Sequence, residues 1–166
     1  MAKIMLLCGR IASGKSRLAD ALRVQESAVV LSCDELMLTL RAAGDFDALA
    51  GRAKDYLCTL AQRLVRMDVS VILDFGFWSR AERRAVSERL AGLPVEWHYV
   101  DVSPADWRRN IADRNRAAAE GRTDAYPVDE GLLAKMEASF EPPDPDEIHV
   151  WHRNRRADRA PVKETP

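Results

Sequence analysis

The sequence predicts an α/β protein in which helices cover both faces of a five-stranded parallel sheet. Short, mostly apolar runs alternate along the 166 residues with segments whose apolar residues recur every three or four positions. Such runs are typical of strands buried on both faces, and their alternation with amphipathic helices is typical of βαβ units. Neither a repeat nor a linker divides the chain. We therefore expect one domain over residues 1–152 and a flexible tail over 153–166.

The N-terminal part begins with two predicted strand–helix pairs. Residues 3–8 form the first apolar run, and residues 14–23 carry the apolar spacing of a helix. A second short strand is predicted over residues 28–31. The helix that follows it is expected over residues 34–43, with Gly44 closing its end.

The central part adds a long helix, a strand and a capped helix. Leucines and a tyrosine at three- and four-residue spacing predict an amphipathic helix over residues 47–67. Residues 69–73 form the third apolar run. Ser79 and Glu82 have the spacing of a capping box, which predicts a helix that ends near Gly92.

The C-terminal part contains the last two predicted strands. Residues 95–102 predict the fourth strand, and Ser103 and Pro104 have the identities of an N-cap and a first helical residue. A further helix is expected over residues 128–139. A proline-rich connection then leads to a fifth strand over residues 148–151.

The segment between the first strand and the first helix matches the phosphate-binding pattern G-x-x-x-x-G-K-[ST]; it reads Gly9-Arg10-Ile11-Ala12-Ser13-Gly14-Lys15-Ser16. The glycines let the backbone curl so that its N–H groups point at phosphate oxygens, and the helix N-terminus adds positive charge. We expect Lys15 to contact the β- and γ-phosphates and Ser16 to bind Mg²⁺. A chance glycine- and serine-rich turn would not need a strand before it and a helix after it. Residues 9–16, with Arg17, are therefore predicted to bind ATP.

Two acidic residues follow predicted strands on the edge where ligands bind in open α/β sheets. Asp74 closes the third apolar run, and its carboxylate could orient Mg²⁺ directly or through water; the alternative is a cap before Gly76. Asp34 follows the second strand and is the candidate general base for a substrate hydroxyl. Its alternative is N-capping of the helix over residues 34–43. One aspartate can also serve both purposes.

Phe75, Phe77 and Trp78 form an aromatic cluster directly after Asp74. They could form the wall of an acceptor pocket, because ligand sites are mostly apolar with few polar groups. The alternative is that these rings simply cover the core.

A segment over residues 114–128 has the composition of a small helical lid. Phosphoryl transfer requires positive charge over the transferred group and exclusion of water, and an arginine-bearing lid supplies both by closing. Arg114, Arg116 and Arg122 are the candidates, and many other arginines of this chain are expected only to interact with solvent.

With these features in place, the chain resembles the small P-loop kinases of the polynucleotide-kinase and zeta-toxin-like group over nearly its whole length. The resemblance is carried by the phosphate loop, Asp34, Val71-Ile72-Leu73-Asp74, Arg114-Asn115…Gly121-Arg122-Thr123…Pro127 and Phe140-Glu141-Pro142-Pro143. It implies a three-layer α/β/α fold with strand order 2-3-1-4-5 and a Mg·ATP site under the lid. It also implies a catalytic aspartate at Asp34 and transition-state arginines at Arg114 and at Arg116 or Arg122. The adenine is expected near Arg114 and residues 151–154.

One departure from this group concerns the acceptor. Polynucleotide kinases of the group carry an arginine three residues after the catalytic aspartate, where it binds the acceptor's own phosphate, but this chain has Met37 there. That exchange removes a charged phosphate contact, and Arg41 is one turn further along. A formal net charge of −1 likewise lacks the basic character of a strand-binding protein.

Composition agrees with an intracellular enzyme. Hydrophobic residues make up 47% and charged residues 31% of the chain, and the apolar run at residues 3–8 is too short for a signal peptide or a membrane span. Three widely spaced cysteines predict buried thiols in a reducing cytoplasm.

The leading hypothesis is therefore an ATP-dependent kinase of a small-molecule hydroxyl, with a metabolite, a nucleoside or an antibiotic as acceptor. The alternatives are a polynucleotide 5′-hydroxyl kinase, a regulatory ATPase that transfers no phosphate, and a toxin that acts on a sugar-nucleotide pool.

Overall fold

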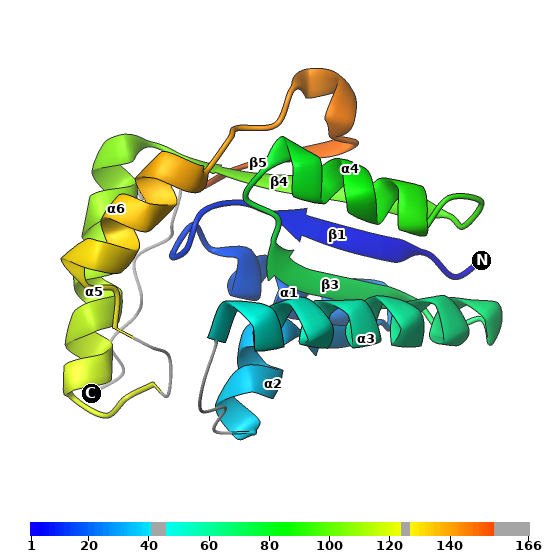
Figure 1. Ribbon diagram of the computed structural model, residues 1–166, viewed down its shortest axis with the longest axis horizontal. Coiled ribbons are helices and arrows are strands. Elements are labelled where there is room, and N and C mark those ends of the chain that lie inside the picture. Colours follow the sequence, from blue (N-terminus) through cyan, green and yellow to red (C-terminus); the bar gives the residue numbers. More distant parts are fainter. Residues whose placement is uncertain (41–45, 124–126, 155–166) are drawn as a thin grey trace.

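The computed structural model describes residues 1–40, 46–123 and 127–154, and it contains a parallel sheet with helices on both faces (Figure 1). Five strands form the sheet in the order β2-β3-β1-β4-β5, which confirms the predicted topology. Each strand pairs in parallel with its neighbours. The strands are β1 Ile4–Cys8, β2 Val29–Ser32, β3 Val71–Gly76, β4 Val95–Val102 and β5 Val150–Asn154.

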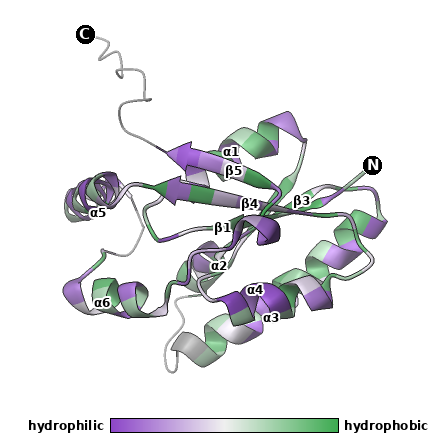
Figure 2. Cartoon of the chain, turned by 90° about the horizontal axis from the view of Figure 1, so that it is seen from above, coloured by the Kyte–Doolittle hydropathy of each residue, from purple (hydrophilic) through white to green (hydrophobic). Residues whose placement is uncertain are grey.

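Helices connect these strands in the manner of a doubly wound fold: α1 Lys15–Gln25, α2 Cys33–Thr39, α3 Phe46–Arg66, α4 Arg80–Arg89, α5 Pro104–Ala119, α6 Glu130–Ser139 and the short 3-10 helix η1 Pro145–Glu147. Helix α1 lies on one face of the sheet, and α3 and α4 lie on the other (Figure 2). Helices α5 and α6 stand side by side beyond the carboxyl ends of the strands (Figure 1). No helix in the described ranges has the length and apolar content to cross a membrane.

Burial explains the position of β1 at the centre of the sheet. All five residues of β1 are buried, and the strand pairs with β3 on one side and β4 on the other. Met5 and Leu7 pack on one face with Ala19 and Leu22 of α1. The larger part of the core lies on the opposite face, against α3 and the C-terminal helices. Because β1 is packed from every side, the loop that follows it has a rigid anchor.

Several element ends differ from those that the sequence predicted. The helix expected over residues 34–43 is observed as Cys33–Thr39, while Gly44 lies outside the described residues. Strand β3 runs on to Gly76, so Asp74 lies within the strand and pairs with Ser32 of β2 instead of following it. Strand β5 is observed over Val150–Asn154, whereas the sequence predicted a strand over residues 148–151. Tertiary hydrogen bonds extend these strands through polar residues that apolar patterning cannot include.

The predicted helix starts are mostly confirmed. Ser103 caps α5 through the N–H of Asp106, with Pro104 as the first helical residue. Ser79 accepts a hydrogen bond from the N–H of Glu82, as expected. The Glu82 carboxylate instead accepts from the N–H of Trp78, so only half of the predicted capping box forms.

A buried ion pair joins α4 to the 3-10 helix η1. Arg83 is 2% exposed and donates from two nitrogens to the Glu147 carboxylate, at 3.2 and 3.0 Å. The same guanidinium donates to the carbonyls of Phe77 and Glu141. This arginine therefore ties the connection before β5 to the end of β3.

Removing the carboxylate from this pair should destabilise the fold. Glu147→Gln leaves a buried guanidinium without its counter-charge, so we expect the free energy of unfolding to fall by about 2 to 3 kcal/mol. Urea denaturation followed by circular dichroism measures the change. Glu88→Gln is the matched control, because Glu88 pairs with Arg84 on the exposed surface of α4 and should contribute about 0.5 kcal/mol or less. Equal effects of the two substitutions would contradict the role of Arg83.

Candidate active site

The predicted phosphate loop forms a tight turn between β1 and α1. Gly9 has φ 152° and Gly14 has φ 105°, and a Cβ at Gly14 would lie 2.5 Å from Nδ2 of Asn154. A Cβ at Gly9 would lie 2.9 Å from Oγ of Ser13 and 3.1 Å from the carbonyl oxygen of Val100. Both positions therefore require glycine for conformation and for space. The two glycines identified in the sequence have the geometric role that the pattern predicts.

The N-terminus of α1 has the chemical features of an anion-binding site. Within the described residues no side chain caps this helix, and its first turn contains no acidic residue. The N–H groups of a first helical turn have no partner inside the helix, and the helix dipole places positive charge there. The chemistry of this turn therefore fits a phosphate group.

Lys15 lies against the same loop. Its ammonium group donates to the carbonyls of Gly9 and Arg10, at 3.1 and 2.8 Å. Burial lowers the pKa of Lys15, whereas the negative charges of Asp74 and Asp34 act in the opposite direction. The lysine is thus held next to two carboxylates at the carboxyl edge of the sheet.

The two residues predicted to bind a metal lie side by side. The Ser16 hydroxyl donates to Oδ2 of Asp74 at 3.4 Å. Burial raises the pKa of Asp74, the charge of Lys15 opposes this, and the charge of Asp34 adds to it. A hydroxyl and a carboxylate are oxygen donors of the kind that Mg²⁺ prefers. No group of three His, Cys, Asp or Glu side chains that could hold a metal occurs among the described residues. The donor set therefore fits a cation that takes its other ligands from phosphate and water.

Asp34 stands in the first turn of α2, exposed to solvent. The alternative role as the N-cap of this helix is wrong, because Ser32 is the N-cap and accepts a hydrogen bond from the N–H of Glu35 at 3.2 Å. Asp34 also interacts electrostatically with Lys15 and with Arg114 of α5. Its carboxylate is thus available at the site and is not needed to start the helix.

The three arginines of the predicted lid have different surroundings. Burial lowers the pKa of Arg114, and the charge of Asp34 opposes this effect. Arg116 is exposed and pairs with Asp113 at 3.6 Å, while Arg122 is exposed and pairs with Glu120. The positive charge of Arg114 also contributes to lowering the pKa of Lys15. Catalytic roles for Arg116 and Arg122 stay predictions.

A side chain of α5 holds the far end of the lid. Asn115 donates to the carbonyl of Val128 at 2.8 Å and accepts from its N–H at 2.7 Å. These two hydrogen bonds join helix α5 to the residue that precedes α6 by two positions. Residues 124–126 of that connection lie outside the described ranges.

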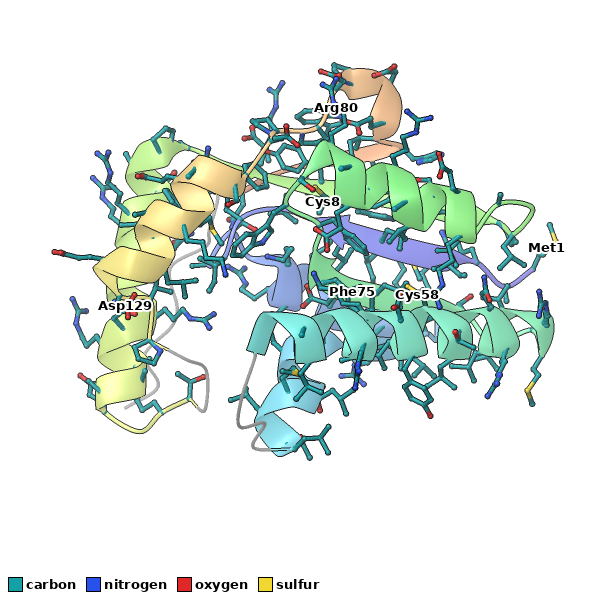
Figure 3. All side chains as sticks on the ribbon, viewed as in Figure 1. Met1, Cys8, Cys58, Phe75, Arg80 and Asp129 are labelled. Carbon is teal, nitrogen blue, oxygen red and sulfur yellow. The ribbon has the colours of Figure 1, made fainter. Side chains whose placement is uncertain are left out.

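Two of the three aromatic residues predicted to face an acceptor belong to the core. Figure 3 labels Phe75 on β3 and Cys8 at the end of β1. Phe75 and Phe77 are 8% and 0% exposed, and Phe77 stacks edge-on against Trp97 at 4.9 Å. Phe77 therefore cannot contact an acceptor in this conformation. Trp78 is only half-buried, so the prediction of an aromatic wall now depends mainly on this residue.

The residues expected near an adenine separate into two groups. The side chain of Asn154 lies beside the phosphate loop and donates to the carbonyl of Ser13. Trp151 packs edge-on against Tyr99, with 4.8 Å between the ring centroids. Trp151 lines a cavity of about 320 Å³ together with Arg10 and Asp101.

Arg17, which was predicted to bind ATP with the phosphate loop, is exposed in the first turn of α1.

Taken together, the strand order and the loop define an α/β fold of the P-loop NTPase type. A family model described as an AAA domain, AAA_33, matches residues 4–143. Because the match spans most of the chain, this protein belongs to that family. No curated protein has a sequence that matches it significantly.

Several solved structures with a similar fold are kinases by their names. An unliganded sugar kinase from Janibacter sp. HTCC2649 aligns with a TM-score of 0.64 and 17% identity over 92% of this chain and 86% of its own. The APS kinase CysC of Mycobacterium tuberculosis, in complex with AMPPNP and APS, aligns with 0.62 and 21% over 96% and 90%. A chain of the Pnkp1/Rnl/Hen1 RNA repair complex aligns with 0.67 and 16% over 83% and 43%. At these identities the likeness shows the fold.

The contact between Asn115 and Val128 generates a prediction about the lid. Asn115→Ala removes both hydrogen bonds, so the N–H of Val128 should exchange with solvent about tenfold faster or more. Hydrogen exchange measured by mass spectrometry or NMR reports this rate. Arg108→Ala, an exposed change on the same helix, should leave the rate unaltered. Unchanged exchange in Asn115→Ala would show that other contacts hold the lid.

Proposed function

We propose that this protein is an ATP-dependent phosphotransferase that moves the γ-phosphate of Mg·ATP to a hydroxyl of a small-molecule acceptor. The observation that carries the proposal is the convergence of four charged side chains from four elements. Lys15 of α1, Asp74 of β3, Asp34 of α2 and Arg114 of α5 interact electrostatically at the carboxyl edge of the sheet.

Each of these residues has a role that its position supports. Lys15 and the N–H groups at the start of α1 would bind the phosphate oxygens. Ser16 and Asp74 would hold Mg²⁺, which shields the negative charge of the phosphates when it is bound. Asp34 would accept the proton of the acceptor hydroxyl as its oxygen bonds to the γ-phosphorus. The bond from that phosphorus to the β–γ bridging oxygen breaks, ADP leaves, and Arg114 would stabilise the charge on the transferred group.

Transfer to a hydroxyl is favoured over simple hydrolysis by the position of Asp34. A hydrolase needs a group that orients water, whereas an exposed carboxylate at the mouth of the site can contact a larger acceptor. The kinase folds of the structural neighbours support the same reaction class, and two of those neighbours are by their names kinases of small molecules.

A panel of acceptors tests the proposed function. The purified chain is incubated with Mg²⁺, γ-labelled ATP, and sugars, nucleosides, hydroxyl-bearing antibiotics or a 5′-hydroxyl oligonucleotide. We expect label on at least one small molecule. Lys15→Ala is the inactive control, because it removes the cation that contacts the phosphates. Label on the oligonucleotide alone would identify a polynucleotide kinase, and release of labelled phosphate without transfer would identify a regulatory ATPase.

The role of Asp34 is tested by its amide. Asp34→Asn keeps the shape of the side chain and removes the base, so phosphoryl transfer should fall by a factor of roughly 10² or more. Affinity for Mg·ATP should remain nearly constant, because Asp34 contacts the acceptor side. Steady-state kinetics and nucleotide titration separate the two quantities. Glu35→Gln is the control, since Glu35 is the exposed neighbour in the same turn. Full transfer activity in Asp34→Asn would exclude this residue as the base.

A further inference from the structure

Three side chains outside the proposed reaction contact the phosphate loop from its outer side. Nε1 of Trp107 donates to the carbonyl of Ile11 at 2.8 Å, and Nδ2 of Asn110 donates to the carbonyl of Ala12 at 3.0 Å. Nδ2 of Asn154, at the end of β5, donates to the carbonyl of Ser13. Three successive carbonyls of the loop are therefore each bound by a side chain from another element.

The middle residue of this run has an unfavourable backbone conformation. Ala12 has φ 56°, in the left-handed region that residues other than glycine rarely adopt. Turns that alternate right- and left-handed residues direct successive N–H groups to one side and form an anion-binding concavity. The donors from Trp107, Asn110 and Asn154 hold the carbonyls on the opposite side. Within the loop the N–H of Ile11 donates to Sδ of Met136 and the N–H of Ser13 donates to the carbonyl of Arg10. The N–H groups at the start of α1 are therefore the backbone donors that this proposal assigns to a phosphate.

Two of the three donors stand on the helix that also carries the lid arginine. Trp107, Asn110 and Arg114 recur at three- and four-residue spacing, so they lie along one face of α5. Trp107 is 2% exposed and is held further by the Arg10 guanidinium, which lies 4.8 Å from its ring centroid. Helix α5 is therefore docked on the loop one turn before Arg114.

We propose that Trp107, Asn110 and Asn154 are positioning residues that hold the phosphate loop in its nucleotide-binding conformation before a nucleotide arrives. Through the first two, helix α5 also fixes Arg114 relative to the loop. This inference rests on the proposed function only in that the loop binds the phosphates of a nucleotide. It does not depend on which acceptor receives the phosphate, nor on whether transfer occurs.

Affinity for Mg·ADP tests the proposal on the full-length chain. Asn110→Leu keeps the branched shape of the side chain and removes the donor, and Asn154→Ala removes the donor on β5. Each should weaken the binding of Mg·ADP by roughly tenfold in isothermal titration, because the loop must then be ordered at the expense of binding. Arg108→Ala is the matched exposed control on α5 and should bind as the wild type does. If Asn110→Leu does not fold, the affinity of Asn154→Ala for Mg·ADP still tests the proposal.

A rescue experiment separates positioning from general stability. Ala12→Gly allows a left-handed φ at no steric cost, so in the Asn110→Leu background it should restore most of the lost affinity. A lower melting temperature with unchanged affinity for Mg·ADP, or the absence of rescue, would overturn the proposal. Failure of the wild-type chain to bind Mg·ADP would instead contradict the proposed function, so the two failures are distinguishable.

Discussion

The structure depends on the loop that connects the fully buried strand β1 to the first turn of helix α1. Strand β1 is bonded to neighbours on both sides and buried on both faces, so its end is fixed in space. Gly9 and Gly14 then reverse the chain within a space that no side chain could share. The carbonyls of this loop point to protein donors, and the N–H groups at the start of α1 have no partner within the helix. An anion is the ligand that completes such a backbone.

Charge balance constrains what this site can bind. Lys15 and Arg114 face Asp34 and Asp74, so the cluster is close to neutral when all four are ionised. Partly buried charges of one sign would be costly without such compensation. A polyphosphate adds several negative charges to this neutral arrangement. A divalent cation at Ser16 and Asp74 would offset part of that charge, which is the physical reason to expect magnesium and nucleotide to bind together.

The residues around Asp34, where the acceptor is expected, bear on the kind of acceptor that can bind. Met37, at the position where the polynucleotide kinases that this chain resembles carry an arginine, is fully buried in the core. Asp34, three residues earlier in the same short helix, is exposed to solvent. Because Phe75 and Phe77 are also core residues, Trp78 and the exposed face of α2 are left as the surfaces for an acceptor. These features agree with the proposal that the acceptor is a small molecule and not a nucleic-acid strand.

Local patterns in the sequence determined the order of the elements, the phosphate loop and the start of α5, because glycines, caps and apolar runs act over a few residues. Only the tertiary structure decided that Phe75 and Phe77 are buried whereas Trp78 is half-buried, and that Ser32 rather than Asp34 caps α2. It alone revealed that Trp107, Asn110 and Asn154 donate to carbonyls of the phosphate loop, which lie 96, 98 and 141 residues away. A hydrogen bond between residues so distant in the chain leaves no periodicity in the sequence, since it exists only once the sheet and α5 have packed.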